Sequence, residues 1–270
     1  VLRFDNGITS AGIAATEPLA RELRLHEGAA AWGRLMARYP SIGAQFEHAT
    51  PTREFAWWPR LSFFSDTIAG DGWVALPSAA GIVDPLLSTG FPLTLLGVQR
   101  VAQAIAEDWN TPRLRVRLQG YAERTADELE TTSRLVGALY DAFGDWERFS
   151  LLSFLYFAAA SFAESARRLG NTARAGDAFL LGGHAEFAPA LQSCLRLAAE
   201  LRDDPTSSRR SALLRAIAQA IEPVNVSGLA DAERHNWFPA EAADLLAGAG
   251  KLGTSAPQVQ AMLERCGFWR

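Results

Sequence analysis

The chain has 270 residues, of which 49% are hydrophobic, so it can build one large domain or two modest ones. Its 30 acidic and 26 basic side chains leave a net charge of -4, which argues against a dedicated nucleic-acid surface. Two cysteines, Cys194 and Cys266, exclude a disulfide framework and favour a reducing, cytoplasmic setting, and no Cys/His cluster has the spacing of a zinc site.

The first part of the chain predicts a mixture of strands and helices. Residues 1–16 alternate around Asp5-Asn6-Gly7, which is a hairpin signal with glycine where a positive φ is needed. A helical pattern follows from Pro18 to Tyr39, with a break before Gly28 and an end at Pro40. The next residues predict short strands, at 53–57, 60–65 and 72–75.

The second part predicts helices almost alone. Pro92 suits the first turn of a helix over 91–106, because its missing N–H costs nothing there. Further helices are predicted at 116–140, 146–169, 171–181, 184–202, 207–221, 239–249 and 256–265. We therefore expect a mixed domain over 1–112, the remainder of a substrate and cofactor domain, and a helical domain over 113–270. Trp237 and Phe238 are predicted to anchor a loop that docks the last helices.

The most apolar segment runs from Phe149 to Phe162. It is shorter than the roughly 20 residues that a bilayer span needs, so we expect a buried core helix and no membrane span.

One stretch carries chemistry: Gly81-Ile82-Val83-Asp84-Pro85-Leu86-Leu87-Ser88-Thr89-Gly90, which runs into Phe91-Pro92. It predicts a loop that enters the N-terminus of a helix, where free backbone N–H groups and the helix dipole favour negative charge. The small residues Ser88, Thr89 and Gly90 would let a ring or an ion approach the main chain. The alternative is a buried strand–loop–helix corner in which Asp84 or Ser88 only caps a helix.

This stretch, together with Trp73-Val74-Ala75-Leu76-Pro77-Ser78-Ala79-Ala80 before it, resembles the isoalloxazine-side loop of flavin-dependent halogenases (the tryptophan halogenase family) and related FAD monooxygenases. The resemblance implies an α/β class fold, an α+β fragment that is the C-terminal part of a FAD/NAD(P)-binding flavoprotein fold, followed by an all-helical region. The Gly-x-Gly-x-x-Gly spacing occurs at Gly248–Gly253, among the predicted C-terminal helices, and does not lie between a strand and a helix as the fingerprint of the ADP-binding half does. We therefore expect a C-terminal portion of a larger flavoenzyme, inactive alone.

The resemblance also implies roles for individual residues. The backbone of Ser88, Thr89 and Gly90 would lie beside the flavin, with Thr89 and Gly90 forming the halide site. The other cofactor-binding positions would be Ser78 beside the ribityl chain, Asp84 and Pro85 in the turn, and Gly81 and Phe91 flanking the ring. Many related flavoproteins have Gly-Asp at Pro77-Ser78, so Ser78 would make a weaker, neutral hydrogen bond. The catalytic lysine of halogenases is not matched by Lys251, and no catalytic residue is assigned.

The expected substrate class follows from one difference between this chain and the tryptophan halogenases. Tryptophan halogenases carry Glu where this chain has Leu87, and that carboxylate aids attack on the indole. Its absence favours a phenol- or pyrrole-like aromatic substrate. Trp57 and Trp58 could line the substrate cavity, where their rings would stack on a flat substrate. The alternative is more common for adjacent aromatic residues before a proline: one packs in the core and the other covers it.

The resemblance implies a bacterial, FAD-dependent halogenase that uses reduced FAD, O2 and chloride or bromide on a small aromatic substrate, free or carrier-bound. A separate flavin reductase would supply the reduced cofactor. One alternative keeps FAD without halide, as a hydroxylating monooxygenase or a flavoprotein that modifies a partner protein. Another is a non-enzymatic helical interaction module, because over half of the chain is predicted as helices without assignable chemistry.

Overall fold

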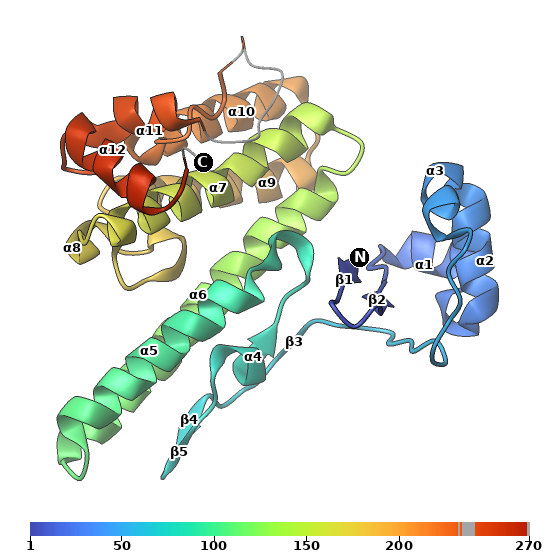
Figure 1. Cartoon of the computed structure of the whole chain (residues 1–270), viewed down its shortest axis with the longest axis horizontal. Coiled ribbons are helices and arrows are strands. Elements are labelled where there is room, and N and C mark those ends of the chain that lie inside the picture. Colours follow the sequence, from blue (N-terminus) through green and yellow to red (C-terminus); the bar gives the residue numbers. More distant parts are fainter. Residues whose placement is uncertain (232, 234–240, 269–270) are drawn as a thin grey trace. The chain divides into compact units, whose positions relative to one another are not determined.

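The computed structural model describes residues 1–231, 233 and 241–268. The chain divides into two compact units, unit 1 over Val1–Phe63 and unit 2 over Phe64–Arg270. Figure 1 shows the elements of each unit in sequence colours. The predicted loop anchors Trp237 and Phe238, and the first residues of the predicted helix 239–249, lie outside the described residues.

Unit 1 begins with the predicted hairpin, in which β1 (Leu2–Arg3) pairs antiparallel with β2 (Thr9–Ser10). Gly7 takes a φ of 81°, as the turn requires. The predicted helix break is present: α1 (Glu17–Leu23), η1 (Leu25–Glu27) and α2 (Ala29–Arg38) are separate, and Gly28 has a φ of 57°. After α2, Pro40 starts a further short helix, α3 (Pro40–Gly43), followed by η2 (Ala44–Phe46), because proline suits a first helical turn.

Short strands and a helical turn precede the long helices of unit 2. Here β4 (Ala69–Gly70) pairs antiparallel with β5 (Trp73–Val74), and β6 (Gly81–Ile82) pairs with β3 (Phe63–Phe64). Between β5 and β6 lies α4 (Pro77–Ala80), and η3 (Leu86–Ser88) leads into α5. The predicted strand at 53–57 is wrong: those residues have no regular structure, and their aromatic side chains are exposed.

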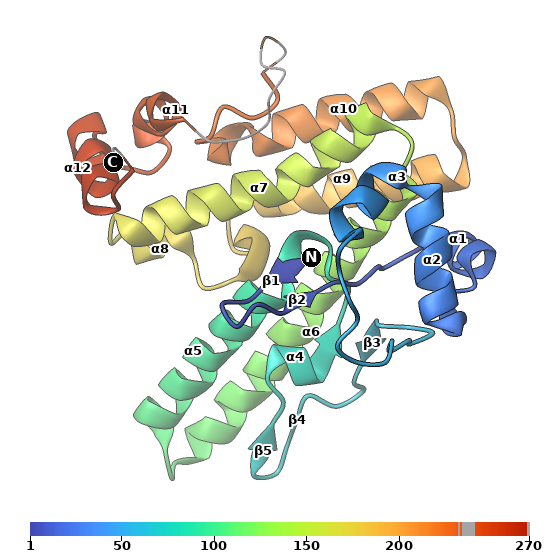
Figure 2. The ribbon, with the colours of Figure 1, turned by 45° about the vertical axis from the view of Figure 1, so that its right-hand side comes forward.

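The remainder of unit 2 is built from helices. Two long ones, α5 (Gly90–Asp108) and α6 (Pro112–Asp141), lie side by side as an antiparallel hairpin, which Figures 1 and 2 both show. The others are α7 (Trp146–Arg168), α8 (Thr172–Ala175), η4 (Phe179–Leu181), α9 (Phe187–Asp203), α10 (Ser207–Ile221), η5 (Glu222–Val224), α11 (Ala242–Ala247), η6 (Gly248–Gly250) and α12 (Ala256–Arg265). The predicted helix over 171–181 is wrong in its middle, because Gly176 leaves the helical region and η4 starts only at Phe179. The predicted division near residue 112 falls in the turn of the α5–α6 hairpin and stays a prediction.

The core of unit 2 lies where α6, α7, α9 and α10 meet, and its largest fully buried side chains include Phe162, Phe187, Leu129 and Leu152. Among the residues that the structure describes, one helix, α7, is long and apolar enough to cross a membrane, but 56% of its most apolar window is buried inside the protein. Burial of that extent is typical of a core helix, as the sequence predicts. The side chain of Asp145 caps the N-terminus of α7 and forms an ion pair with Arg210 of α10, with 2.9 Å between N and O. The hydrogen bond from Arg210 lowers the pKa of Asp145 to about 2.

The helical turn α4 lies directly against α5 because Gly97 has no side chain. A Cβ atom at Gly97 would lie 2.4 Å from Cδ and 2.6 Å from Cγ of Pro77, which is buried and rigid. We expect Gly97→Ala to lower the free energy of unfolding of unit 2 by about 1–3 kcal/mol, as overpacking does. Gly120→Ala is the matched control, since a Cβ at Gly120 meets nothing within 4 Å. Urea denaturation checks both, and equal midpoints would contradict the close approach.

An exposed apolar row follows one face of α5. Its members recur at third and fourth positions or multiples of them, so they share a face. They are Phe91 (78% exposed), Leu95 (66%), Val98 (43%), Ile105 (41%) and Trp109 (63%). Contiguous exposed apolar surface of this kind is typical of interaction sites.

Candidate functional site

Asp84 fixes the loop between β6 and α5. One of its carboxylate oxygens accepts a hydrogen bond from the backbone N–H of Leu86 at 2.7 Å, and the other accepts one from the hydroxyl of Tyr140 on α6 at 2.8 Å. Burial raises the pKa of Tyr140 well above its usual value, and the hydrogen bond to Asp84 and the negative charge of Asp84 raise it further. The loop is therefore tied to α6 by a charge-assisted hydrogen bond.

The loop stores backbone strain immediately before α5. Leu87 and Ser88 have φ values of 63° and 53°, a left-handed conformation that costs a non-glycine residue about 1–3 kcal/mol. Thr89 returns to the right-handed region, with φ -61° and ψ -23°. A left-handed residue followed by a right-handed one turns successive amides toward the same side, and such concavities bind anions.

The amides at this turn differ in their availability. The N–H of Ser88 donates to the carbonyl of Pro85 at 3.0 Å, so it is already used. Within the described residues, no hydrogen bond uses the N–H groups of Thr89, Gly90 and Phe91. These groups also stand at the N-terminus of a 19-residue helix, where the dipole favours negative charge. Of the predicted backbone positions Ser88, Thr89 and Gly90, only Ser88 has an N–H that is already used, and Phe91 adds a further unused amide.

The space beside these amides is open. A Cβ atom built at Gly90 meets nothing within 4 Å, and Phe91 is 78% exposed. Thr89 as a whole residue is only 2% exposed, so it anchors the turn, and the open part of the main chain is that of Gly90. A flat ring or a small anion can therefore reach this part of the main chain without displacing a side chain.

The other predicted cofactor-binding residues lie nearby in unit 2. Ser78 is exposed on α4, and its hydroxyl has no partner among the described residues. Gly81 is buried in β6 with an extended backbone (φ -176°), and Pro85 is exposed at the start of η3. Their roles in binding FAD stay predictions.

The two tryptophans that were predicted for a substrate cavity belong to unit 1. Trp57 and Trp58 are 46% and 65% exposed. The ring of Trp57 meets His26 edge-on, with 6.1 Å between ring centroids. Their contact with a substrate stays a prediction.

A buried ion pair positions α5. The sequence did not predict this pair. Arg100 of α5 forms a two-pronged contact with Glu128 of α6, at 2.6 and 2.8 Å, and both side chains are at most 10% exposed. The same Glu128 carboxylate accepts the backbone N–H of Phe179 at 2.7 Å, and Arg100 also donates to the carbonyl of Asp177. The pair therefore joins α5, α6 and the segment before η4. Its members are 28 positions apart, so no local spacing reveals it.

Tyr140→Phe tests how far the Asp84 contact fixes the loop. We expect it to lower the free energy of unfolding by about 1–2 kcal/mol at neutral pH, because a hydrogen bond to a charged acceptor in a partly exposed site is lost. The pKa of Tyr140 is raised in the folded state. The stabilisation is therefore present below the unfolded pKa of about 10 and is lost as the pH rises through the higher folded value. Urea denaturation of both proteins at pH 7 and above pH 10 should show the difference shrinking, and a constant difference would contradict the role of the hydroxyl.

No family model matches the chain. A curated protein does: monodechloroaminopyrrolnitrin halogenase PrnC of Pseudomonas fluorescens is 34% identical over 125 residues, which is 43% of this chain and 21% of PrnC. This chain resembles part of a halogenase. The predicted resemblance is thus confirmed.

Solved structures of halogenase PltM resemble the chain. The crystal structure of PltM matches with a TM-score of 0.60 and 19% identity, over 73% of this chain and 43% of PltM. PltM in complex with phloroglucinol and FAD matches with a TM-score of 0.61 and 18% identity, over 77% of this chain and 45% of PltM. At this identity the likeness shows the fold, and it confirms the prediction of a part of a flavoprotein fold followed by helices. The chain spans less than half of PltM and about a fifth of PrnC.

Proposed function

We propose that the chain is part of an FAD-dependent halogenase that acts on an electron-rich aromatic substrate. The observation that carries the proposal is the turn into α5, where the amides of Thr89, Gly90 and Phe91 are unused and the space beside Gly90 is open. The similarity to PrnC supports the halogenase class, and the match to the FAD complex of PltM supports a flavoprotein fold.

The residues at the turn fit a flavin ring and a halide ion. Bound reduced FAD supplies the activation of O2. The amides of Thr89 and Gly90 hold the halide, and the positive end of the α5 dipole adds to the attraction. Gly90 lets the edge of the ring approach the backbone, while Phe91 flanks it. Asp84 keeps this turn in place through Tyr140 and Leu86.

The proposed substrate is a phenol- or pyrrole-like ring, free or carrier-bound. Leu87 stands where tryptophan halogenases place a carboxylate, and electron-rich rings react without that assistance. PltM has been crystallised with phloroglucinol, which is a phenol, and this agrees with the proposal. The reduced cofactor comes from a separate flavin reductase in a bacterial cytoplasm. The exposed row on α5 is the surface on which a further part of the flavoprotein packs, because the match covers only 45% of PltM.

The test uses the natural polypeptide that carries residues 1–270. We expect the purified protein to be yellow, with the absorption spectrum of bound FAD. Supplied with a flavin reductase, NADH, O2 and phloroglucinol, it should form a product with the mass shift of chlorine or bromine, and only when that halide is present. Hydroxylation in halide-free buffer would instead identify a monooxygenase. A colourless protein that cannot be loaded with FAD would favour the helical interaction module.

A further inference from the structure

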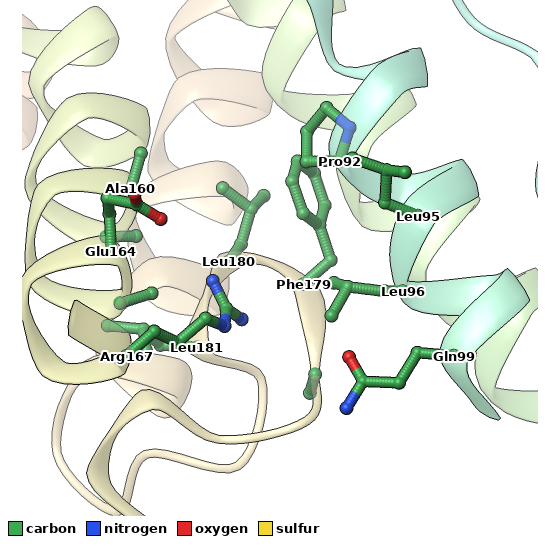
Figure 3. Close-up of a pocket in the computed structure, with 13 residues that line it drawn as sticks. Pro92, Leu95, Leu96, Gln99, Ala160, Glu164, Arg167, Phe179, Leu180 and Leu181 are labelled. Atoms are coloured by element: carbon green, nitrogen blue, oxygen red, sulfur yellow. The ribbon is translucent and has the colours of Figure 1, made fainter. Parts of the chain in front are cut away.

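Unit 2 contains a cavity that is not lined by the loop into α5. Its volume is about 390 Å³, and it lies between α5, α7 and η4. Figure 3 shows the side chains that line it. The walls are mainly apolar, with Leu96 from α5, Ala159 from α7, and Phe179 and Leu180 from η4. A cavity of this size with apolar walls fits a small ring system.

Three polar side chains stand at the opening of this cavity: Gln99, Glu164 and Arg167. The carboxylate of Glu164 is engaged by Nε of Arg168 at 2.6 Å. Within the described residues, no hydrogen bond or ion pair uses the side chains of Gln99 and Arg167. Figure 3 shows both extending from their helices toward the cavity. The uncommitted groups are thus one guanidinium and one amide, which suit an anionic oxygen.

The η4 wall of the cavity is fixed before any ligand arrives. Leu180 and Leu181 have φ values of 52° and 53°, a strained conformation that the surrounding structure must enforce. Glu128 holds the N–H of Phe179 at 2.7 Å, and Arg100 in turn holds Glu128. A preformed wall lowers the entropy that a ligand must lose on binding.

We propose that this cavity binds a flat aromatic carboxylate or phenolate. Its ring lies against Leu96 and Phe179, and its anionic oxygen is held by Arg167 and Gln99. Pro92, which also lines the cavity, follows Gly90 by two residues, so such a ligand lies close to the turn that is proposed for the flavin. The assignment of this ligand as the substrate rests on the proposed function, whereas the binding of an aromatic anion in the cavity does not.

Calorimetric titration of residues 1–270 with 2-naphthoate tests the assignment, and 2-naphthamide serves as the uncharged probe of the same shape. We expect 2-naphthoate to bind at one site, about tenfold or more tightly than 2-naphthamide. Arg167→Gln should remove that preference and leave 2-naphthamide binding within about twofold. Ala160→Phe should abolish binding of both probes, because Ala160 lines the cavity and is exposed, so the larger side chain fills the cavity without disturbing the core.

Arg196→Gln is the matched control, since Arg196 is an exposed arginine of α9 that does not line the cavity. The proposal is overturned if neither probe binds, or if the Ala160→Phe variant binds the probes as tightly as the parent does. It is also overturned if Arg167→Gln and Arg196→Gln weaken the binding of 2-naphthoate equally. Circular dichroism confirms that each variant is folded. The flavin content of the natural polypeptide separates the two proposals. Binding of 2-naphthoate by a protein without FAD supports the cavity and removes the substrate role.

Discussion

Arg100→Met is expected to lower the free energy of unfolding of unit 2 by about 3–5 kcal/mol, because it leaves a buried carboxylate without its counter-charge. Glu128 is 7% exposed and is held by both outer nitrogens of Arg100, with 2.6 and 2.8 Å between N and O. Water cannot replace the guanidinium at that depth, and Met fills a similar volume without offering charge. The loss should also release the segment before η4, because Glu128 binds the N–H of Phe179.

Arg124→Met is the matched control for this prediction. Arg124 pairs with the carboxylate of Asp177 in the same segment before η4, but the two side chains are 44% and 74% exposed. An exposed pair contributes about 0–1 kcal/mol, so this variant should unfold close to the parent. Urea denaturation followed by circular dichroism gives both values. Equal effects of the two substitutions would show that burial of the Arg100–Glu128 pair does not increase its contribution to the free energy of unfolding.

The helices of unit 2 could be predicted from the sequence because their signals are local. Apolar spacing located α6, α7, α9 and α10 within a few residues, and Gly7 and Gly28 marked the turn and the break that the structure contains. The errors arose where tertiary packing decides. A strand was predicted at 53–57, but no neighbouring strand pairs with these residues. The residues near Gly176 read as helix, although the buried Glu128 holds Phe179 in a separate turn.

The candidate site was predictable in its location and not in its conformation. The motif from Gly81 to Gly90 indicated a loop entering a helix, and the loop lies there. Left-handed Leu87 could not be foreseen, because a β-carbon disfavours that conformation and tertiary contacts, among them the one between Asp84 and Tyr140, hold the loop. The Arg100–Glu128 pair joins two helices through side chains with no sequence relation. Local patterns therefore locate the turn, whereas long-range contacts determine which amides remain free.

Gly90→Leu is expected to weaken FAD binding and to raise the KM for bromide about tenfold or more in the natural polypeptide, with little change in stability. A Cβ at Gly90 meets no protein atom within 4 Å, so the fold has room for the side chain. The same space is where the ring and the halide must reach the amides of Thr89 and Gly90, and each hydrogen bond to a charged group contributes about 1.5–3 kcal/mol. Gly90→Ala should give a smaller loss, because a methyl group blocks less of the opening.

Gly120→Leu separates this effect from a general effect of removing a helical glycine. Gly120 lies in α6, and a Cβ there also meets nothing within 4 Å. This variant should keep the FAD affinity and the bromide KM of the parent, because nothing in the proposal places a ligand beside it. Absorbance titration gives the flavin affinity, and initial rates at varied bromide give the KM. A folded Gly90→Leu protein with both values within twofold of the parent would mean that flavin and halide lie elsewhere, since no ligand could approach these amides past a leucine side chain.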